Sequence, residues 1–229
     1  MCEICQDRGI VVIDGNTAKR CECMIRRQII NRFKNSKMSK SMLKQTFENF
    51  NFSYYGDKIF AAKKAVEAAK TFTKNVIEGQ ADGLILTGLT GRGKTYLACC
   101  IANELLRKNI NTLFCVVPDL LDQIKDTYNK GSEYSEMDLI DTAKEVAVLI
   151  LDDLGAHQYT EWARGKLFTI LNYRINHNLP TVITTNLSVE DVGEAIGDRA
   201  ASRIIELCQP YMLEADVDIR LQKRLNKTK

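Results

Sequence analysis

The sequence predicts an α/β domain built on a parallel β-sheet with helices on both faces, preceded by a small cysteine-rich unit. Three observations carry this expectation. Short apolar segments alternate with helical segments, a glycine-rich loop joins one apolar segment to the helix that follows it, and another apolar segment ends in two aspartates. The 229 residues suit one such domain and a small appendage.

The alternating segments begin at residue 57. A helix is expected over residues 57–79, because apolar side chains recur there at helical spacing. The segment 146–151 is apolar without interruption, which indicates a strand buried on both faces. The other expected elements are, in order, a strand at 83–87, a helix at 94–107, a strand at 112–117, a helix with Pro118 in its first turn, a helix at 162–176 and a strand at 181–185.

The glycine-rich loop has the chemistry of a phosphate-binding loop. Its residues match the pattern G-x-x-x-x-G-K-[ST] at every required position: Gly88, Leu89, Thr90, Gly91, Arg92, Gly93, Lys94 and Thr95. Glycines let backbone N–H groups turn toward a phosphate, and the following helix points its positive end at the same anion. Lys94 then meets the outer phosphates and Thr95 offers its hydroxyl to Mg²⁺. A chance match is disfavoured, because a strand precedes the loop and a helix follows it, as ATP binding requires.

Two carboxylates follow the apolar segment 146–151. Asp152 and Asp153 lie 57 residues beyond the end of the loop motif, where an acidic strand end typical of P-loop NTPases is expected. Asp152 would bind Mg²⁺ through water, and Asp153 would orient or deprotonate the attacking water. The alternative is a plain turn at Asp153, Leu154 and Gly155.

Four cysteines cluster at the amino terminus. Cys2 and Cys5 form one close pair, Cys21 and Cys23 form another, and fifteen residues separate the pairs. This arrangement predicts a four-thiolate zinc site in which the metal replaces a hydrophobic core. Unmetallated thiols or a redox pair are the alternatives. The remaining cysteines and the two histidines are expected to be ordinary buried thiols and ordinary surface or core side chains: Cys99, Cys100, Cys115, Cys208, His157 and His177.

Charge is distributed unevenly, although the net charge is only +3. Residues 1–44 contain ten Lys/Arg and four Asp/Glu, whereas the rest contains 22 and 25. The chain is therefore divided into a cysteine-rich unit (1–24), a basic helical linker (25–45) and a nucleotide-binding domain (46–229). The basic arm indicates contact with nucleic acid or an acidic partner, or else a solvated linker helix. No run reaches the ~18 apolar residues of a membrane span and no secretory signal begins the chain, so no membrane association and a cytoplasmic location are expected.

Further motifs resemble AAA+ ATPases, and among them the DnaC/DnaI-type helicase loaders. They are Thr184-Thr185-Asn186-Leu187, Asp198 to Ile204, Asp218-Ile219-Arg220, Leu167 to Arg174, Leu179-Pro180-Thr181, Asp152 to Gly155, and Lys94-Thr95-Tyr96-Leu97 at the start of the loop's helix. The resemblance covers roughly residues 46–222. It implies an AAA+ ATPase with ATP and Mg²⁺ as cofactors, whose nucleotide contacts extend to Tyr96.

The resemblance also assigns roles to single residues. Asn186 would be the sensor 1 amide, Arg220 the sensor 2 arginine, and Arg203 the arginine finger that reaches a neighbouring subunit. Arg199, on the same helical face, is the other candidate finger, and an ordinary surface position is the alternative for both Arg203 and Arg220. The AAA+ pair is typically Asp-Glu, so Asp153 implies slow hydrolysis.

Three functions follow for comparison. The first is a helicase loader that binds a replicative DNA helicase and single-stranded DNA and self-associates through its ATP site. The second is a transposase-helper ATPase of the IstB type, which has nearly the same core; the cysteine-rich start favours the loader. The third is a non-catalytic zinc-binding adaptor, which the intact Lys94, Thr95, Asp152 and Asn186 disfavour.

Overall fold

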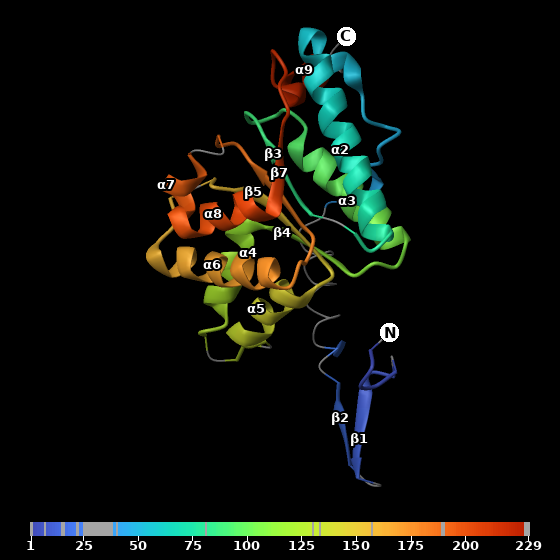
Figure 1. The fold of residues 1–229 in the computed structure, drawn as a ribbon, viewed down its shortest axis with the longest axis vertical. Helices are drawn as coiled ribbons and strands as arrows, with labels where there is room; N and C mark the ends of the chain where they lie inside the picture. Colours follow the sequence, from blue (N-terminus) through green and yellow to red (C-terminus); the bar gives the residue numbers. More distant parts are fainter. Residues whose placement is uncertain are drawn as a thin grey trace.

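The computed structural model describes residues 2–6, 8–14, 17–21, 23–24, 39, 41–80, 82–129, 131–132, 134–156, 158–188 and 191–226. Within this part of the chain, a five-stranded parallel sheet in the order β4-β5-β6-β3-β7 forms the centre of the main domain (Figure 1). The predicted parallel α/β architecture is therefore confirmed.

Strands and helices of this domain alternate along the chain. In order they are α2 (Ile59–Ile77), β3 (Gly83–Thr87), α3 (Lys94–Arg107), β4 (Thr112–Val116), α4 (Val117–Asp126), α5 (Glu136–Glu145), β5 (Val148–Leu154), α6 (Glu161–Asn176), β6 (Thr181–Thr185), α7 (Val192–Ile196), α8 (Asp198–Leu207), β7 (Cys208–Met212) and α9 (Ile219–Asn226). Short 3₁₀ turns at Met42–Lys44, Phe52–Tyr54 and Gly56–Lys58 precede α2.

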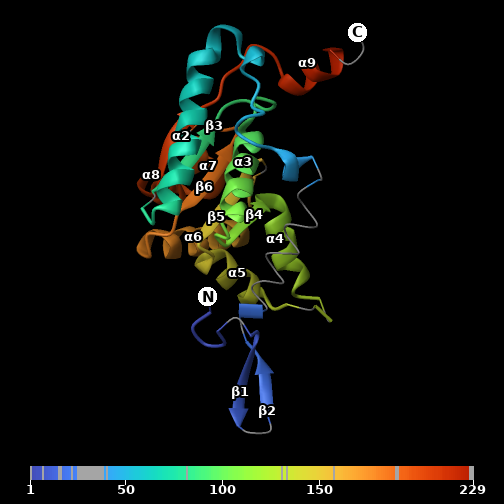
Figure 2. The same ribbon diagram turned by 90° about the vertical axis from the view of Figure 1, so that its right-hand side faces the viewer.

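Helices cover both faces of the sheet, and successive strand residues point to opposite cores. Leu84, Leu86 and Ile150 pack with α2 and α3 in one core. Ile85 and Leu151 belong to the other core, with α4, α5, α6 and α8. Figures 1 and 2 show α2 and α3 side by side, with the sheet between them and α6 and α8. Because both faces are covered, the central strands contain apolar residues in succession, as the sequence indicated.

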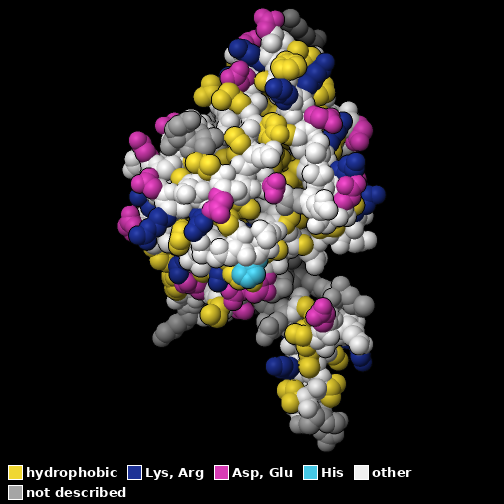
Figure 3. Space-filling model, viewed as in Figure 1, with side chains coloured by type: hydrophobic (Ala, Val, Ile, Leu, Met, Phe, Trp, Pro, Cys, Tyr) yellow, Lys and Arg dark blue, Asp and Glu magenta, His cyan; other side chains and the backbone are white. Residues whose placement is uncertain are grey.

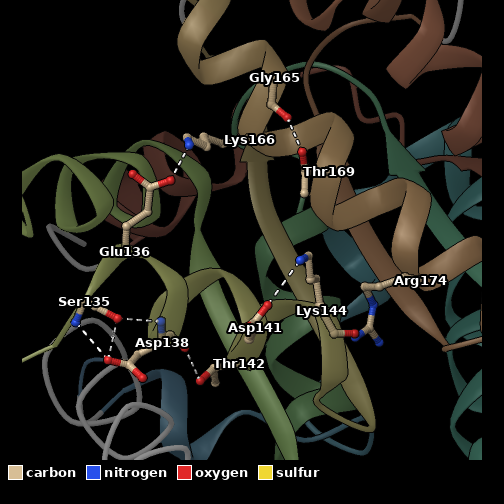
Figure 4. Close-up of polar contacts among 10 residues, drawn as sticks. All are labelled: Ser135, Glu136, Asp138, Asp141, Thr142, Lys144, Gly165, Lys166, Thr169 and Arg174. Atoms are coloured by element: carbon tan, nitrogen blue, oxygen red, sulfur yellow. Dashed lines mark hydrogen bonds and ion pairs between the residues drawn. The ribbon is translucent and has the colours of Figure 1, made fainter.

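A buried arginine holds α5 against α6. Arg174, at 0% exposure, donates through its guanidinium to the carbonyls of Ala143, Lys144 and Val146 at distances of 2.8–3.1 Å. Figure 4 shows Arg174 beside Lys144. It also donates to the hydroxyl of Thr181 at 2.8 Å and to the carbonyl of Pro180 at 2.7 Å. The negative end of the α5 dipole and these carbonyls compensate the charge, as a carboxylate would elsewhere. Burial lowers the pKa of Arg174 to about 9, so the side chain remains charged at neutral pH.

The amino-terminal unit contains an antiparallel hairpin of β1 (Ile10–Asp14) and β2 (Thr17–Arg20). The side chains of Ile10, Val12 and Ile13 are exposed on it, and Figure 3 shows hydrophobic groups along the hairpin. The basic linker predicted over 25–45 lies mostly outside the described residues, as does His157. In the described part of the chain, no helix combines the length and the apolar character needed to cross a bilayer.

Candidate nucleotide-binding site

The phosphate-binding loop connects β3 to α3 and requires glycine at its turns. Gly88 has φ +127°, and a Cβ there would approach the carbonyl oxygen of Leu213 to 2.2 Å. Gly93, the N-cap of α3, has φ +95° and would collide with the hydroxyl of Tyr55 at 2.6 Å. Residues with side chains are therefore excluded at both positions, and the loop presents backbone amides beside the positive end of α3.

Lys94 is held inside the curve of this loop. Its side chain is 7% exposed, and Nζ donates to the carbonyl oxygens of Gly88 at 2.6 Å and Leu89 at 2.9 Å. Burial lowers the pKa of Lys94, while the carboxylates of Asp153 and Asp152 act in the opposite direction. The ammonium is thus a fixed, poorly solvated cation, which suits it to bind an anion strongly.

The acidic strand end lies beside the loop. Asp152 is 4% exposed and accepts hydrogen bonds from the hydroxyl of Thr184 at 2.6 Å and that of Thr95 at 3.2 Å. Burial raises its pKa, and the two hydroxyl donors partly oppose this shift. Asp153 is exposed and has φ +62°. The pairing of β5 with β6 shifts between Leu151 and Leu154, so β5 continues through both aspartates as a bulge instead of ending at residue 151.

A cavity of about 660 Å³ brings most of the proposed nucleotide contacts together. Its walls come from the phosphate-binding loop, the ends of β5 and β6, and the first turn of α9. The proposed residues that line it are Thr90, Gly91, Arg92, Gly93, Lys94, Thr95, Tyr96, Asp152, Asp153, Asn186 and Arg220. The parallel strands β3, β5 and β6 all end at this edge of the sheet, which explains how residues far apart in sequence meet there.

An aromatic wall, absent from the sequence-based site, completes the cavity. Phe50 stacks on Tyr55 with ring centroids 5.4 Å apart and meets Tyr96 edge-on at 5.6 Å. Tyr55 donates from its hydroxyl to the carbonyl of Arg92 at 2.9 Å, and burial raises the pKa of this phenol. Such a wall suits a planar base. The signal was the density of Phe and Tyr between residues 47 and 55, just before α2.

Three more cavity residues were not anticipated from the sequence. Gln45 lines the cavity, and its buried Oε1 has no hydrogen-bond partner among the residues that the structure describes. Lys223, one turn beyond Arg220 on α9, has Nζ 5.6 Å from the ring centroid of Tyr54. Asn49, next to Phe50 in the sequence, also lines the cavity. Neither Gln45 nor Lys223 stands in a recognisable pattern; only the fold brings them to the cavity.

The whole arrangement matches known proteins. A family model described as IstB-like ATP binding protein matches residues 16–208, which is most of the chain. The chain belongs to this family. The IstB-like chain is 27% identical over 214 residues to the replicative helicase loader DnaI of Bacillus subtilis (strain 168), covering 85% of this chain and 67% of DnaI. It is 26% identical over 166 residues to the replicative helicase loader DnaC of Escherichia coli (strain K12), covering 72% and 67%.

Solved structures give the same result. The crystal structure of DnaI has a TM-score of 0.62 at 27% identity and covers 80% of the IstB-like chain and 95% of the solved chain. The crystal structure of the DnaC helicase loader has a TM-score of 0.66 at 25% identity, with coverages of 77% and 100%. The predicted AAA+ fold and the resemblance to DnaC/DnaI-type loaders are thereby confirmed. The family is one of P-loop ATPases, which supports ATP and Mg²⁺ as its cofactors.

The two candidate finger arginines lie away from the cavity of their own chain. Arg203 and Arg199 both belong to α8, and neither lines the cavity. Arg203 donates to Glu206 at 2.7 Å and is partly exposed, and Arg199 is exposed. Both are therefore placed where a neighbouring molecule has access to them.

The four amino-terminal cysteines converge. Their Sγ atoms all lie within 4.8 Å of one another, with Cys2 and Cys21 3.7 Å apart and Cys5 and Cys23 3.3 Å apart. A tetrahedral zinc site with Zn–S of ~2.3 Å has sulfur atoms about 3.8 Å apart. The N–H of Gly9 donates to Cys5 Sγ at 3.3 Å, which is a contact that stabilises thiolate ligands. The residues present fit a zinc ion. By contrast, Cys99, Cys100, Cys115 and Cys208 are buried thiols of the sheet domain, as expected. His177 stacks on Tyr173 at the surface.

Proposed function

We propose that this chain binds and hydrolyses ATP in the 660 Å³ cavity and uses the cycle to assist delivery of a replicative DNA helicase to single-stranded DNA. The observation that carries the ATPase part is the convergence of Lys94, Thr95, Asp152 and Asn186 on one cavity. The aromatic wall gives this cavity room for a base beside the phosphate site.

Each residue has a distinct task in the reaction. Lys94 and the loop amides bind the outer phosphates, and Asn186 contacts the γ-phosphate. Thr95 and Asp152 would hold Mg²⁺, which neutralises charge on the phosphates when it is bound. Asp153 orients water for attack on the γ-phosphorus and takes its proton, so that ADP and phosphate leave. Arg220 lines the same cavity and would act as the sensor 2 arginine. Because the side chain of Asp153 is shorter than the typical glutamate, we expect slow turnover.

The helicase part rests on the relatives, DnaI and DnaC, whose names describe replicative helicase loaders. The test is capture of a purified replicative helicase on the immobilised full chain, with and without ATP. We expect nucleotide-dependent capture by the wild type and loss of the ATP effect in Lys94→Ala. Equal capture with and without ATP would contradict a role for the ATP cycle in binding the helicase. No capture in either condition would contradict the loader.

A second function, that of a transposase helper, is suggested by the description of the family as IstB-like ATP binding protein. An IstB-type transposase helper would assemble on duplex DNA with ATP and recruit a transposase. Binding assays with duplex and single-stranded DNA of equal length separate the two proposals. Preference for the duplex, together with no capture of helicase, would replace the loader by the transposase helper.

Zinc is proposed as a structural ion of residues 1–24, held by Cys2, Cys5, Cys21 and Cys23. The support is the mutual approach of the four Sγ atoms. Elemental analysis of the purified chain should find one Zn²⁺ per chain, and Cys21→Ser should lose it. Cys208→Ser is the matched control, since this buried thiol lies in the sheet domain. A metal-free protein with a folded amino terminus would contradict the site.

Single-stranded DNA is assigned to the basic arm. Deletion of residues 1–38 removes eight of the ten basic residues of the arm and spares Met42 and Gln45, whose carbonyls accept from Asn103 at 2.9 Å. We expect binding that weakens steeply with salt and largely disappears in the deletion variant. Equal binding by the shortened chain would show that the arm is only a solvated linker.

A further inference from the structure

One hydroxyl group lies between the two aspartates of the site. Thr184, in β6, is 1% exposed. Its Oγ1 donates to Asp152 Oδ1 at 2.6 Å and accepts from the backbone N–H of Asp153 at 2.9 Å. The hydroxyl therefore contacts both consecutive acidic residues, one through its carboxylate and the other through its peptide.

The two contacts define the geometry of the acidic strand end. Oδ1 of Asp152 is engaged by Thr184, which leaves Oδ2 directed at the hydroxyl of Thr95, 3.2 Å away. The backbone N–H that donates to Thr184 Oγ1 is that of Asp153, which lies in the bulge and has φ +62°. A residue in this region of φ is strained and needs contacts that hold it. Thr184 supplies such a contact, and Asn186 follows two residues later, directly after the end of β6.

We propose that Thr184 is a positioning residue that fixes the rotation of the Asp152 carboxylate for the divalent cation and anchors the peptide of Asp153. The inference rests on the proposed ATPase function. It adds a mechanical link between β5, which bears the acidic pair, and β6, which leads to the γ-phosphate contact. Thr184 itself is not among the described residues that line the cavity.

The hydroxyl group of Thr184, and not the shape of its side chain, makes these two contacts. Valine has the same branching and nearly the same volume, but it would leave Asp152 Oδ1 and the N–H of Asp153 without their partner inside the protein. The Asp152 carboxylate would then be free to rotate toward other hydrogen-bond donors. Serine keeps the hydroxyl and is the conservative replacement.

The test measures binding of a fluorescent ATP analogue to the full chain in excess EDTA and in excess Mg²⁺. The variants are Thr184→Val, Thr184→Ser and the control Thr112→Val. Thr112 is another buried strand threonine, in β4, whose hydroxyl donates to the carbonyl of Ile110 at 3.1 Å, away from the cavity. We expect Thr184→Val to bind the analogue normally in EDTA but to lose about tenfold or more of the affinity gained with Mg²⁺. Thr184→Ser should regain most of this gain, and Thr112→Val should behave like the wild type.

The outcomes are decisive and separable from the proposed function. If Mg²⁺ raises the affinity of Thr184→Val for the analogue as much as it raises that of the wild type, the inference is overturned. An equal loss of affinity in EDTA and in Mg²⁺ would also overturn it, because that result indicates general damage to the cavity. Thermal melting of the two valine variants identifies misfolding, in which case Thr184→Ser against Thr184→Ala provides the same comparison. A wild type that gains affinity with Mg²⁺ yet neither hydrolyses ATP nor captures helicase would contradict the proposed function alone.

Discussion

Lys94 shows at the scale of a single residue how the fold prepares a site for phosphate. Its ammonium is removed from water and held by the carbonyls of Gly88 and Leu89. Removal of a desolvated cation costs the folded state little, whereas the bound phosphates would lose their main positive partner. Lys94→Ala should therefore reduce ATP turnover to background and weaken ATP binding by about tenfold or more, with an unchanged melting temperature. Lys74→Ala, at an exposed lysine of α2, is the control. Normal turnover in Lys94→Ala would remove the enzyme proposal.

The charge of Asp152 is unfavourable for folding, because burial raises the pKa of this carboxyl group above its value in the unfolded chain. Above that raised pKa the folded protein contains an ionised carboxylate that water would solvate better, so its ionisation destabilises the fold. This cost is absent at low pH and appears as pH rises from the unfolded pKa through the folded pKa. Asn at this position accepts from Thr184 without a charge.

We therefore predict that Asp152→Asn abolishes hydrolysis but stabilises the nucleotide-free chain by roughly 1 kcal/mol, or about 2–4 °C in melting temperature. The stabilisation should grow as pH rises above about 4 and become constant above the raised pKa. Melting curves at several pH values in the absence of nucleotide test this. Lower stability of the variant at neutral pH would show that attraction to Lys94, and not burial, dominates at Asp152.

At the scale of elements, Arg174 fastens the end of α5 to α6 and to the start of β6. Arg174→Met keeps the apolar stem but leaves the carbonyls of Ala143 and Val146 without their donor. We expect a loss of about 3 kcal/mol in unfolding free energy, which lowers the melting temperature by roughly 6 °C or more. Arg107→Met is the control, since Arg107 is largely exposed and forms a surface ion pair with Glu104. Equal melting of the two variants would contradict the structural role of Arg174.

The elements also show what the sequence determines locally and what it leaves to the fold. The predicted strand 83–87, helix 94–107 and strand 181–185 coincide with β3, α3 and β6, because apolar runs and the glycine loop mark their ends. The extension of β5 through Leu154 was not predicted, since Asp152 and Asp153 read as a strand end. Both residues contact Thr184, which is a neighbour in the sheet but distant in sequence.

The candidate site divides in the same way. The loop motif and the acidic pair are recognisable because phosphate and metal chemistry fix residue types at fixed spacings. The aromatic wall could not be predicted, because Phe50 and Tyr55 cannot be distinguished in the sequence from ordinary core residues. Strand β7 and helix α9 were not anticipated either, although α9 brings Arg220 and Lys223 to the cavity. Spacing along the chain carries no information on such tertiary neighbours.

At the scale of the whole molecule, the remaining question is whether one chain contains a complete catalytic site. The cavity holds the cations of Arg92, Lys94, Arg220 and Lys223, but Arg203 lies outside it on α8. Arg203 is engaged with Glu206, an exposed pair that costs at most about 1 kcal/mol to break. A neighbouring chain can therefore recruit it easily. An arginine supplied in this way is worth ~10³ or more in rate.

We predict that Arg203→Ala binds ATP nearly as the wild type does but fails to hydrolyse it, and that activity per chain rises with protein concentration. Mixing Arg203→Ala with Lys94→Ala should restore part of the activity, because one interface in the mixture pairs an intact phosphate-binding loop with an intact Arg203. Arg107→Ala mixed with Lys94→Ala is the control for dilution of active chains, since Arg107 is an exposed arginine of α3. The measurement is steady-state phosphate release, with co-assembly checked by light scattering. A mixture that assembles and stays inactive would exclude Arg203 from acting between chains, and the same experiment would then be repeated with Arg199→Ala, its neighbour on the exposed side of α8.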